Sequence, residues 1–140
     1  MVIGEKLWEG TGKTQIMIVQ NVNADGVTVE FTWSGDIKGI GRAKGVDGTV
    51  TFTGRKLAPI SGPGKGTTTG QGILFAKGGM VAIKSTGYGN PKWENVKSVE
   101  IWSFIAASKK LSWLNDVVAI VTQEGDPSWK EFNVTINEWK

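Results

Sequence analysis

The fold is decided by the stretch Thr67–Ile105, TTTGQGILFAKGGMVAIKSTGYGNPKWENVKSVEIWSFI. It divides into three runs rich in apolar, β-branched and aromatic residues: Thr67–Lys77, Met80–Gly89 and Trp93–Ile105. Gly78-Gly79 separates the first two runs and Asn90-Pro91 the last two, and these residues favour tight turns and loops. Short runs bounded by such turns predict three successive antiparallel strands.

The chain before this stretch repeats the pattern. Lys13–Val22 is apolar and ends in the turn-forming residues Asn23–Gly26. The next run, Val27–Ser34, alternates strictly between apolar and polar side chains, which is typical of a strand with one buried face. Gly35–Val46 is interrupted by glycines and predicts a poorer strand, and Thr49–Leu57 alternates again. Strands joined by hairpin turns are therefore expected throughout the first half.

One loop and one short helix interrupt the strands. Pro59–Gly66 (PISGPGKG) is a Gly/Pro-rich loop and a candidate lid. In Ala106–Asp116, Leu111 and Leu114 are three residues apart on one helical face, which predicts a short helix or 3-10 turn. Strands at Val117–Gln123 and Trp129–Trp139 follow. About eight strands in one domain, residues 1–140, predict an all-β antiparallel barrel.

The amino-acid composition excludes several classes of function. Among 140 residues there are 20 glycines and seven tryptophans, and no cysteine or histidine. Without Cys or His, Ser-His-Asp and Cys-His catalysis and the usual zinc ligands are excluded, and we expect neither a metal nor a cofactor. The net charge of +3 comes from scattered basic residues, so no nucleic-acid partner is expected. No apolar run approaches the ~20 residues of a membrane span, and the N-terminus lacks a signal-peptide core; the expected location is the cytoplasm.

Glycines recur two apart in or beside the strands. The four pairs are Gly10/Gly12, Gly39/Gly41, Gly70/Gly72 and Gly87/Gly89. Residues two apart on a strand face the same side, so each pair clears one patch of barrel wall. The pairs either let the strands bend at barrel corners or open space for a ligand.

Glu100 is the first candidate for catalysis. It lies between Val99 and Ile101 and shares a strand face with Trp102 and Phe104. A carboxyl buried against tryptophan has a raised pKa and can act as an acid or a base. In the alternative interpretation Val99 and Ile101 face the core and Glu100 faces water. Both faces of the strand are apolar, so the sequence leaves the choice open.

Three other residues are candidate ligand contacts. Tyr88, the only tyrosine, lies between two glycines, and its hydroxyl could assist Glu100 by donating to a ligand carbonyl or an enolate. Arg42 and Arg55 lie on glycine-rich strand ends, where they could clamp a carboxylate at the barrel mouth. The alternatives are a surface tyrosine and two solvated arginines.

The tryptophans form the other candidate site. Trp33 and Trp102 are predicted to contact a flat hydrophobic or aromatic ligand if they converge in the cavity. Trp93, Trp113 and Trp129 are candidates for the same cage or for the core. Trp8 and Trp139, near the termini, could close the barrel ends or form a contact between subunits of a homo-oligomer.

The second half of the chain resembles a group of small, largely uncharacterised prokaryotic proteins. The likeness lies in Gly70-Gln71-Gly72, in Ser108–Asn115 (SKKLSWLN) and in the closing Asn137–Lys140. In fold these are similar to calycin-like and allene-oxide-cyclase-like barrels. That resemblance implies a hydrophobic cavity and isomerase or cyclase chemistry, but it supplies no catalytic residues, because function does not follow from fold.

Three functions are compatible with the sequence. The first is binding of a small hydrophobic or aromatic molecule inside the barrel. The second is a cofactor-free isomerase or cyclase that uses Glu100, with Tyr88 or an arginine as the oxyanion partner. The third is a self-assembling structural or interaction protein with a tryptophan-rich exterior. A buried carboxylate in a polar cavity favours the enzyme, and a dry, apolar cavity favours the binding protein.

Overall fold

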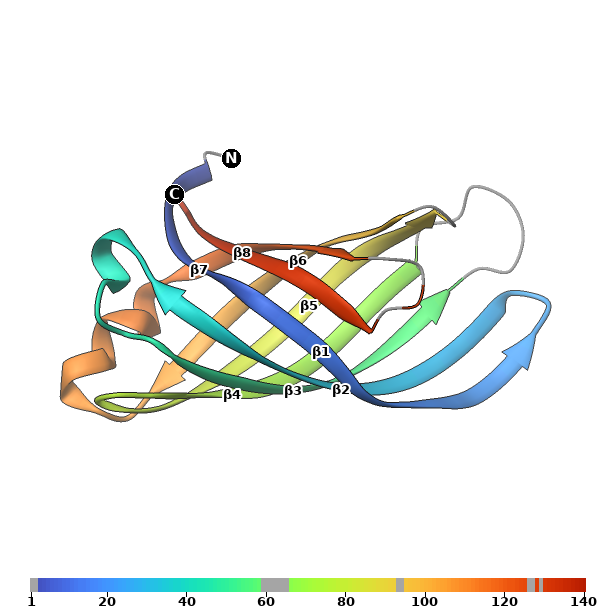
Figure 1. Cartoon of the computed structure of the whole chain (residues 1–140), viewed down its shortest axis with the longest axis horizontal. Helices are drawn as coiled ribbons and strands as arrows, with labels where there is room; N and C mark the ends of the chain where they lie inside the picture. Colours follow the sequence, from blue (N-terminus) through green and yellow to red (C-terminus); the bar gives the residue numbers. More distant parts are fainter. Residues whose placement is uncertain (1–2, 59–65, 93–94, 126–127, 129) are drawn as a thin grey trace.

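The computed structural model of the chain describes residues 3–58, 66–92, 95–125, 128 and 130–140, and it shows a closed antiparallel barrel (Figure 1). Over these residues eight strands follow one another around the barrel in chain order, and the last pairs with the first. The strands are β1 (Ile3–Asn23), β2 (Gly26–Gly39), β3 (Gly48–Ala58), β4 (Gly66–Ala76), β5 (Gly79–Lys92), β6 (Asn95–Ala106), β7 (Val118–Gly125) and β8 (Glu131–Trp139). The predicted all-β barrel of about eight strands is confirmed.

Three strand boundaries were predicted wrongly, and the first is the start of β1, which lies at Ile3 and not at Lys13. Gly35 does not begin a new strand: β2 continues to Gly39, and Gly35 pairs with Gly12 on β1 and Val50 on β3. A Cβ at Gly35 would collide with the Thr11 carbonyl oxygen, so the glycine lets the strands approach closely and does not end β2. Likewise β5 runs through the predicted loop at Asn90-Pro91 to Lys92. Of the predicted lid, Gly66 is the first residue of β4, and the rest, residues 59–65, lies outside the described residues, as do Trp93 and Trp129.

The middle of the barrel is filled by a stack of aromatic rings. Trp33, Phe52 and Trp102 all contact one another, with ring centroids 5.4, 5.9 and 6.3 Å apart and nearly parallel planes. Phe104 extends the stack, edge-on to Trp102, and reaches Trp8 at 5.8 Å. Each such ring buries a large apolar area, so this stack supplies much of the core.

Glycines on the wall make room for these rings. A Cβ at Gly70 or Gly72 would meet the Phe52 ring. A Cβ at Gly54 would lie 2.6 Å from the Phe31 ring, and one at Gly12 would lie 2.6 Å from the Phe132 ring. Large and small side chains therefore tile the narrow interior, as in other small barrels. The space beside Gly70 and Gly72 is occupied by protein and not left open.

Two 3-10 helices, η1 (Gly41–Ala43) and η2 (Lys109–Asp116), lie at one end of the barrel (Figure 1). Leu111 and Leu114 of η2 are buried, which confirms the predicted apolar face. The Asn115 side chain accepts a hydrogen bond from the Ala106 amide (2.7 Å) and donates to the Ala106 carbonyl (3.1 Å). Ser108 Oγ donates to the Gly78 carbonyl at 2.8 Å. The Ser108–Asn115 motif thus anchors the helix to the barrel.

The same end holds Arg42 and the terminal tryptophan Trp8. Trp8 is fully buried and its Nε1–H donates to the Val46 carbonyl (2.8 Å), so it is a core residue and not a surface for subunit contact. Arg42 Nη1 donates to Glu138 at 3.2 Å, and its guanidinium lies 4.6 Å from the centre of the Trp113 ring. In the described part of the chain no helix is long and apolar enough to cross a membrane.

Candidate ligand-binding site

Strand β6 turns Glu100 into the barrel. Ser98, Glu100, Trp102 and Phe104 are buried, whereas Val99 is exposed, as are Ile101 and Ile105. Of the two interpretations of this strand, the one that places Val99 and Ile101 in the core is therefore wrong. Glu100 is only 2% exposed, and Gly87 lies directly opposite it on β5.

One oxygen of the Glu100 carboxyl receives two hydrogen bonds. Ser85 Oγ donates to Oε1 at 2.5 Å, and Trp102 Nε1 donates to the same oxygen at 3.4 Å. These bonds hold the carboxyl in one orientation against the aromatic stack. Burial raises the pKa of Glu100 above its ordinary value of 4.5, and the two hydrogen bonds and the charge of Lys56 act in the opposite direction.

Lys56 is the second buried ionisable residue of the interior. It is 2% exposed, because β3 points Val50, Phe52, Gly54 and Lys56 inward in turn. A Cβ at Gly89 would lie 2.9 Å from Lys56 Nζ, so this glycine gives the ammonium group its space. Burial lowers the pKa of Lys56 from 10.5 to about 7, and the nearby Glu100 carboxylate partly offsets that effect.

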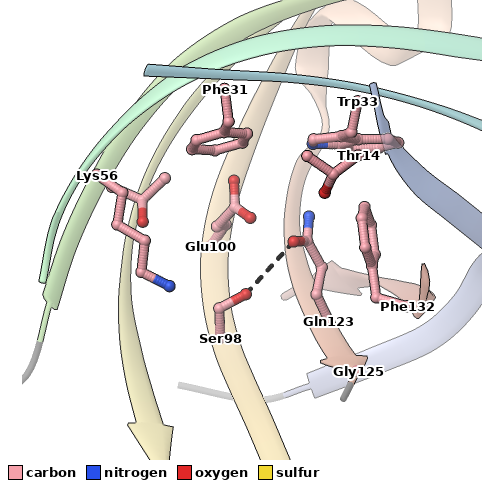
Figure 2. A pocket seen from close by; sticks show the side chains of 10 residues that line it. Thr14, Phe31, Trp33, Lys56, Ser98, Glu100, Gln123, Gly125 and Phe132 are labelled. Atoms are coloured by element: carbon pink, nitrogen blue, oxygen red, sulfur yellow. Dashed lines mark hydrogen bonds between the residues drawn. The ribbon is translucent and has the colours of Figure 1, made fainter. Parts of the chain in front are cut away.

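These side chains line a small cavity away from the end that holds η1 and η2 (Figure 2). Its volume is about 30 Å³, and it is bounded by three aromatic side chains, Phe31, Trp33 and Phe132, and by polar groups from five strands. The polar lining residues are Thr14, Lys56, Thr68, Ser98, Glu100 and Gln123. Figure 2 shows the Lys56 amine and the Glu100 carboxyl directed into the same space, beside the Ser98–Gln123 hydrogen bond of 3.4 Å.

Two N–H donors of this cavity have no hydrogen-bond partner among the described residues. They are Trp33 Nε1 and Gln123 Nε2, and both are buried. In either orientation of the Gln123 amide, one of its polar atoms contacts Ser98 and the other has no hydrogen-bond partner among the described residues. An unsatisfied buried donor costs about 1–3 kcal/mol, so an acceptor atom from outside the protein, on a water or a ligand, would be bound here.

The site unites some of the predicted residues and not others. Trp33 lines the cavity, and Trp102 contacts it through Glu100. Tyr88 is 65% exposed on the outer face of β5, because the neighbouring residues that face inward on that strand are Gly87 and Gly89. Arg42 belongs to the opposite end, and Arg55 points outward from β3. Tyr88, Arg42 and Arg55 therefore do not share a cavity with Glu100.

Sequence reasoning missed Lys56, Ser85 and Gln123. Val50, Phe52 and Lys56 lie an even number of residues apart on β3, so they face the same side of the strand. This alternation could have indicated that Lys56 points inward. The signal is weak because lysine is rarely buried and Gly54 interrupts the apolar pattern. Ser85 and Gln123 lie on apolar strands, where their inward direction depends on the register with neighbouring strands.

The same barrel fold occurs in two bacterial proteins of solved structure. No protein-family model matches the chain, and neither does any curated protein. A protein of unknown function from Clostridium acetobutylicum superposes with a TM-score of 0.79 at 13% identity, over 99% of this chain and 97% of that one. A β-barrel-like protein from Acinetobacter baumannii gives a TM-score of 0.77 at 16% identity, over 99% and 96%.

An enzyme from Penicillium herquei has the same fold. Its TM-score is 0.70 at 18% identity, and the match covers 96% of this chain and 92% of the enzyme. At these identities the likeness shows a shared barrel fold and does not transfer an activity. The chain is thus a β-barrel protein of a kind found in bacteria and in a fungal enzyme.

Proposed function

We propose that the barrel binds a small, flat hydrophobic molecule that carries an oxygen acceptor such as a carbonyl or hydroxyl group. The observation that carries this proposal is the pair of buried, unsatisfied donors, Trp33 Nε1 and Gln123 Nε2, in a cavity that also contains Lys56 and Glu100. Ligand sites in proteins combine apolar walls with a few converging polar groups. Phe31, Trp33 and Phe132 would supply the walls here.

The ligand would need more space than the cavity now has. A volume of about 30 Å³ accommodates one or two water molecules. Phe31 and Phe132 are the half-buried members of the aromatic lining, whereas Trp33 is fully buried. Rotation of these two rings would enlarge the cavity, and rotamer changes of this kind are common on binding.

The test uses naphthol, a flat hydroxylated aromatic compound, as the probe in isothermal titration calorimetry. We expect wild-type protein to bind it and Phe132→Ala, with a larger cavity, to bind it more tightly. Glu100→Gln and Lys56→Met should each weaken binding about tenfold or more, whereas Tyr88→Phe, on the outer face, should leave it unchanged. If naphthol does not bind even to Phe132→Ala, or binds equally to every variant, the proposal is wrong.

Native mass spectrometry of freshly purified protein supplies an independent readout. A retained small molecule, recovered by denaturing extraction, would reveal the chemical class of the natural ligand. Wild-type protein that carries only water is expected to bind naphthol by displacing that water from Trp33 and Gln123. Loss of the retained molecule in Glu100→Gln, but not in Tyr88→Phe, would locate it in the cavity.

A second function, proton transfer on the bound molecule, is favoured by Glu100 and Lys56. A carboxyl with a raised pKa beside an amine with a lowered pKa is an arrangement common at catalytic sites. Glu100, as the carboxylate, would remove a proton from the carbon next to a ligand carbonyl. Lys56, as the ammonium, would stabilise the enolate oxygen that forms, and return of the proton at another carbon would complete an isomerisation.

Deuterium exchange tests this second function without a known substrate. Tetralone, a flat aromatic ketone, carries acidic hydrogens next to its carbonyl, and base catalysis in D₂O replaces them with deuterium. We expect wild-type protein to accelerate the exchange and Glu100→Gln to lose about 10²- to 10⁴-fold of that acceleration. Binding without exchange would leave the binding function standing and eliminate proton transfer.

A further inference from the structure

The β1–β2 hairpin extends beyond the barrel (Figure 1). β1 pairs with β8 only as far as Lys13, which lies opposite Glu131, and the Thr14 amide then donates to the Lys130 carbonyl. Its pairing with β2 continues on the other side as far as Asn23. Among the described strands, none pairs with the second edge of β1 from Gln15 to Asn23.

This edge is apolar and faces water. All residues from Gln15 to Asn23 are exposed. Five are large and hydrophobic, with exposed fractions between 45% and 61%: Ile16, Met17, Ile18, Val19 and Val22. A long exposed edge of this kind offers unpaired backbone groups and apolar side chains together, and it is a template for pairing with another strand.

Two of the usual protections of an edge strand, lysine and proline, are missing here. No charged residue lies between Lys13 and Asp25, whereas native edges are commonly blunted by lysine or proline. Two register shifts interrupt the β1–β2 ladder, between Thr14 and Ile16 and between Val19 and Asn21. Such bulges increase the local twist, which disfavours growth of a long flat sheet and favours a single closed pair.

We infer that this edge pairs with the same edge of a second copy of the chain, antiparallel and related by a two-fold axis at Val19. The sequence is complementary to itself in that register. In that register the free segment Gln15–Asn23 pairs with itself over its whole length, and Ile16 of one copy lies opposite Val22 of the other. The axis repeats this contact, so an apolar Ile16–Val22 pair lies on each side of the central Val19–Val19 pair.

Analytical ultracentrifugation of the full chain tests the interface. We expect wild-type protein to dimerise and Val19→Lys, which sets like charges opposite each other at the axis, to raise the dissociation constant at least about tenfold. Ile105→Lys is the matched control, since Ile105 is equally exposed (62%) on the outer face of β6. A monomeric wild type, or a dimer that both variants weaken equally, would overturn the inference.

Two further measurements test the register. Ile16→Lys and Val22→Glu should each weaken the dimer, and the double variant, which places opposite charges across the interface, should restore it. Because the chain has no cysteine, Val19→Cys should form an intermolecular disulfide under mild oxidation, and Ile105→Cys should not. A double variant that stays monomeric, or cross-linking that is equal at the two positions, would contradict the pairing at Val19.

Discussion

Gly87 lies directly opposite Glu100 in the β5–β6 ladder, and a Cβ at Gly87 would lie 2.6 Å from Glu100 Cγ and 2.8 Å from its Cα. The backbone there has no room to yield, because the Val99 carbonyl oxygen is also in contact. The glycine therefore makes the position of the carboxyl possible. At the Gly87/Gly89 pair the space is filled by the side chains of Glu100 and Lys56, so this pair does not leave open space for a ligand as the second explanation of the paired glycines proposed.

Gly87→Ala is expected to destabilise the protein by about 1–3 kcal/mol, since an extra methyl group in a packed interior forces side chains and backbone to shift. Thr86→Ala, the neighbouring position on the outer face, is the matched control and should have little effect. Urea unfolding measures both. Equal stabilities of Gly87→Ala and Thr86→Ala would show that the strand can relax around the methyl group.

Lys56 should make the protein more stable as the pH rises above neutrality. Its pKa is about 7 in the folded state and 10.5 as an ordinary lysine, so the unfolded chain binds more protons between those values. The free energy of unfolding then increases with pH in that window, by at most about 1.4 kcal/mol per pH unit, and is reduced as the pH falls towards 7. Lys56→Met should remove this dependence in urea titrations, whereas Lys84→Met, on the outer face, should retain it.

Glu100 contributes a pH dependence of the opposite sign. Its pKa is raised, so its stabilising contribution is complete below about pH 4.5 and is lost as the pH rises through the folded-state value. Glu100→Gln should therefore flatten a decline in stability that begins above pH 4.5, measured by the urea midpoint. A decline that persists in this variant would have to come from other carboxyl groups.

The sequence predicted the barrel because its alternating runs and turn residues agree locally with an antiparallel sheet. It could not orient β6, because Val99, Ile101 and Ile105 are apolar yet exposed, and alternation has no meaning on a strand with two apolar faces. Tyr88 was assigned to the site on its glycine neighbours alone. The barrel register turns those glycines inward and the tyrosine outward.

Phe52 and Gly70 should show strong energetic coupling. A Cβ at Gly70 would collide with the Phe52 ring, so Gly70→Ala should destabilise the wild type by about 1–3 kcal/mol. Phe52→Leu removes the ring that is in the way, and Gly70→Ala should then cost less, with a coupling energy of about 0.5–3 kcal/mol. Urea unfolding of the two single variants and the double variant measures this. Strictly additive effects would show that the collision with the Thr53 carbonyl, and not the ring, sets the cost.

The proton-transfer function has a testable pH signature. Glu100 acts only as the carboxylate, which forms above its raised pKa, and Lys56 stabilises an enolate only as the ammonium, which it loses above about pH 7. The rate of tetralone exchange, corrected for the uncatalysed reaction, should therefore rise and then fall with pH in a bell shape. Lys56→Arg keeps its charge at high pH, so the falling limb should disappear while the rising limb remains. Because Glu100 and Lys56 interact, the apparent pKa of each limb in the wild type is a property of both residues together. Only the variants show which residue is responsible for which limb. A falling limb that survives Lys56→Arg would mean that some other group loses its proton near neutral pH, and Lys56 would then have no part in the chemistry.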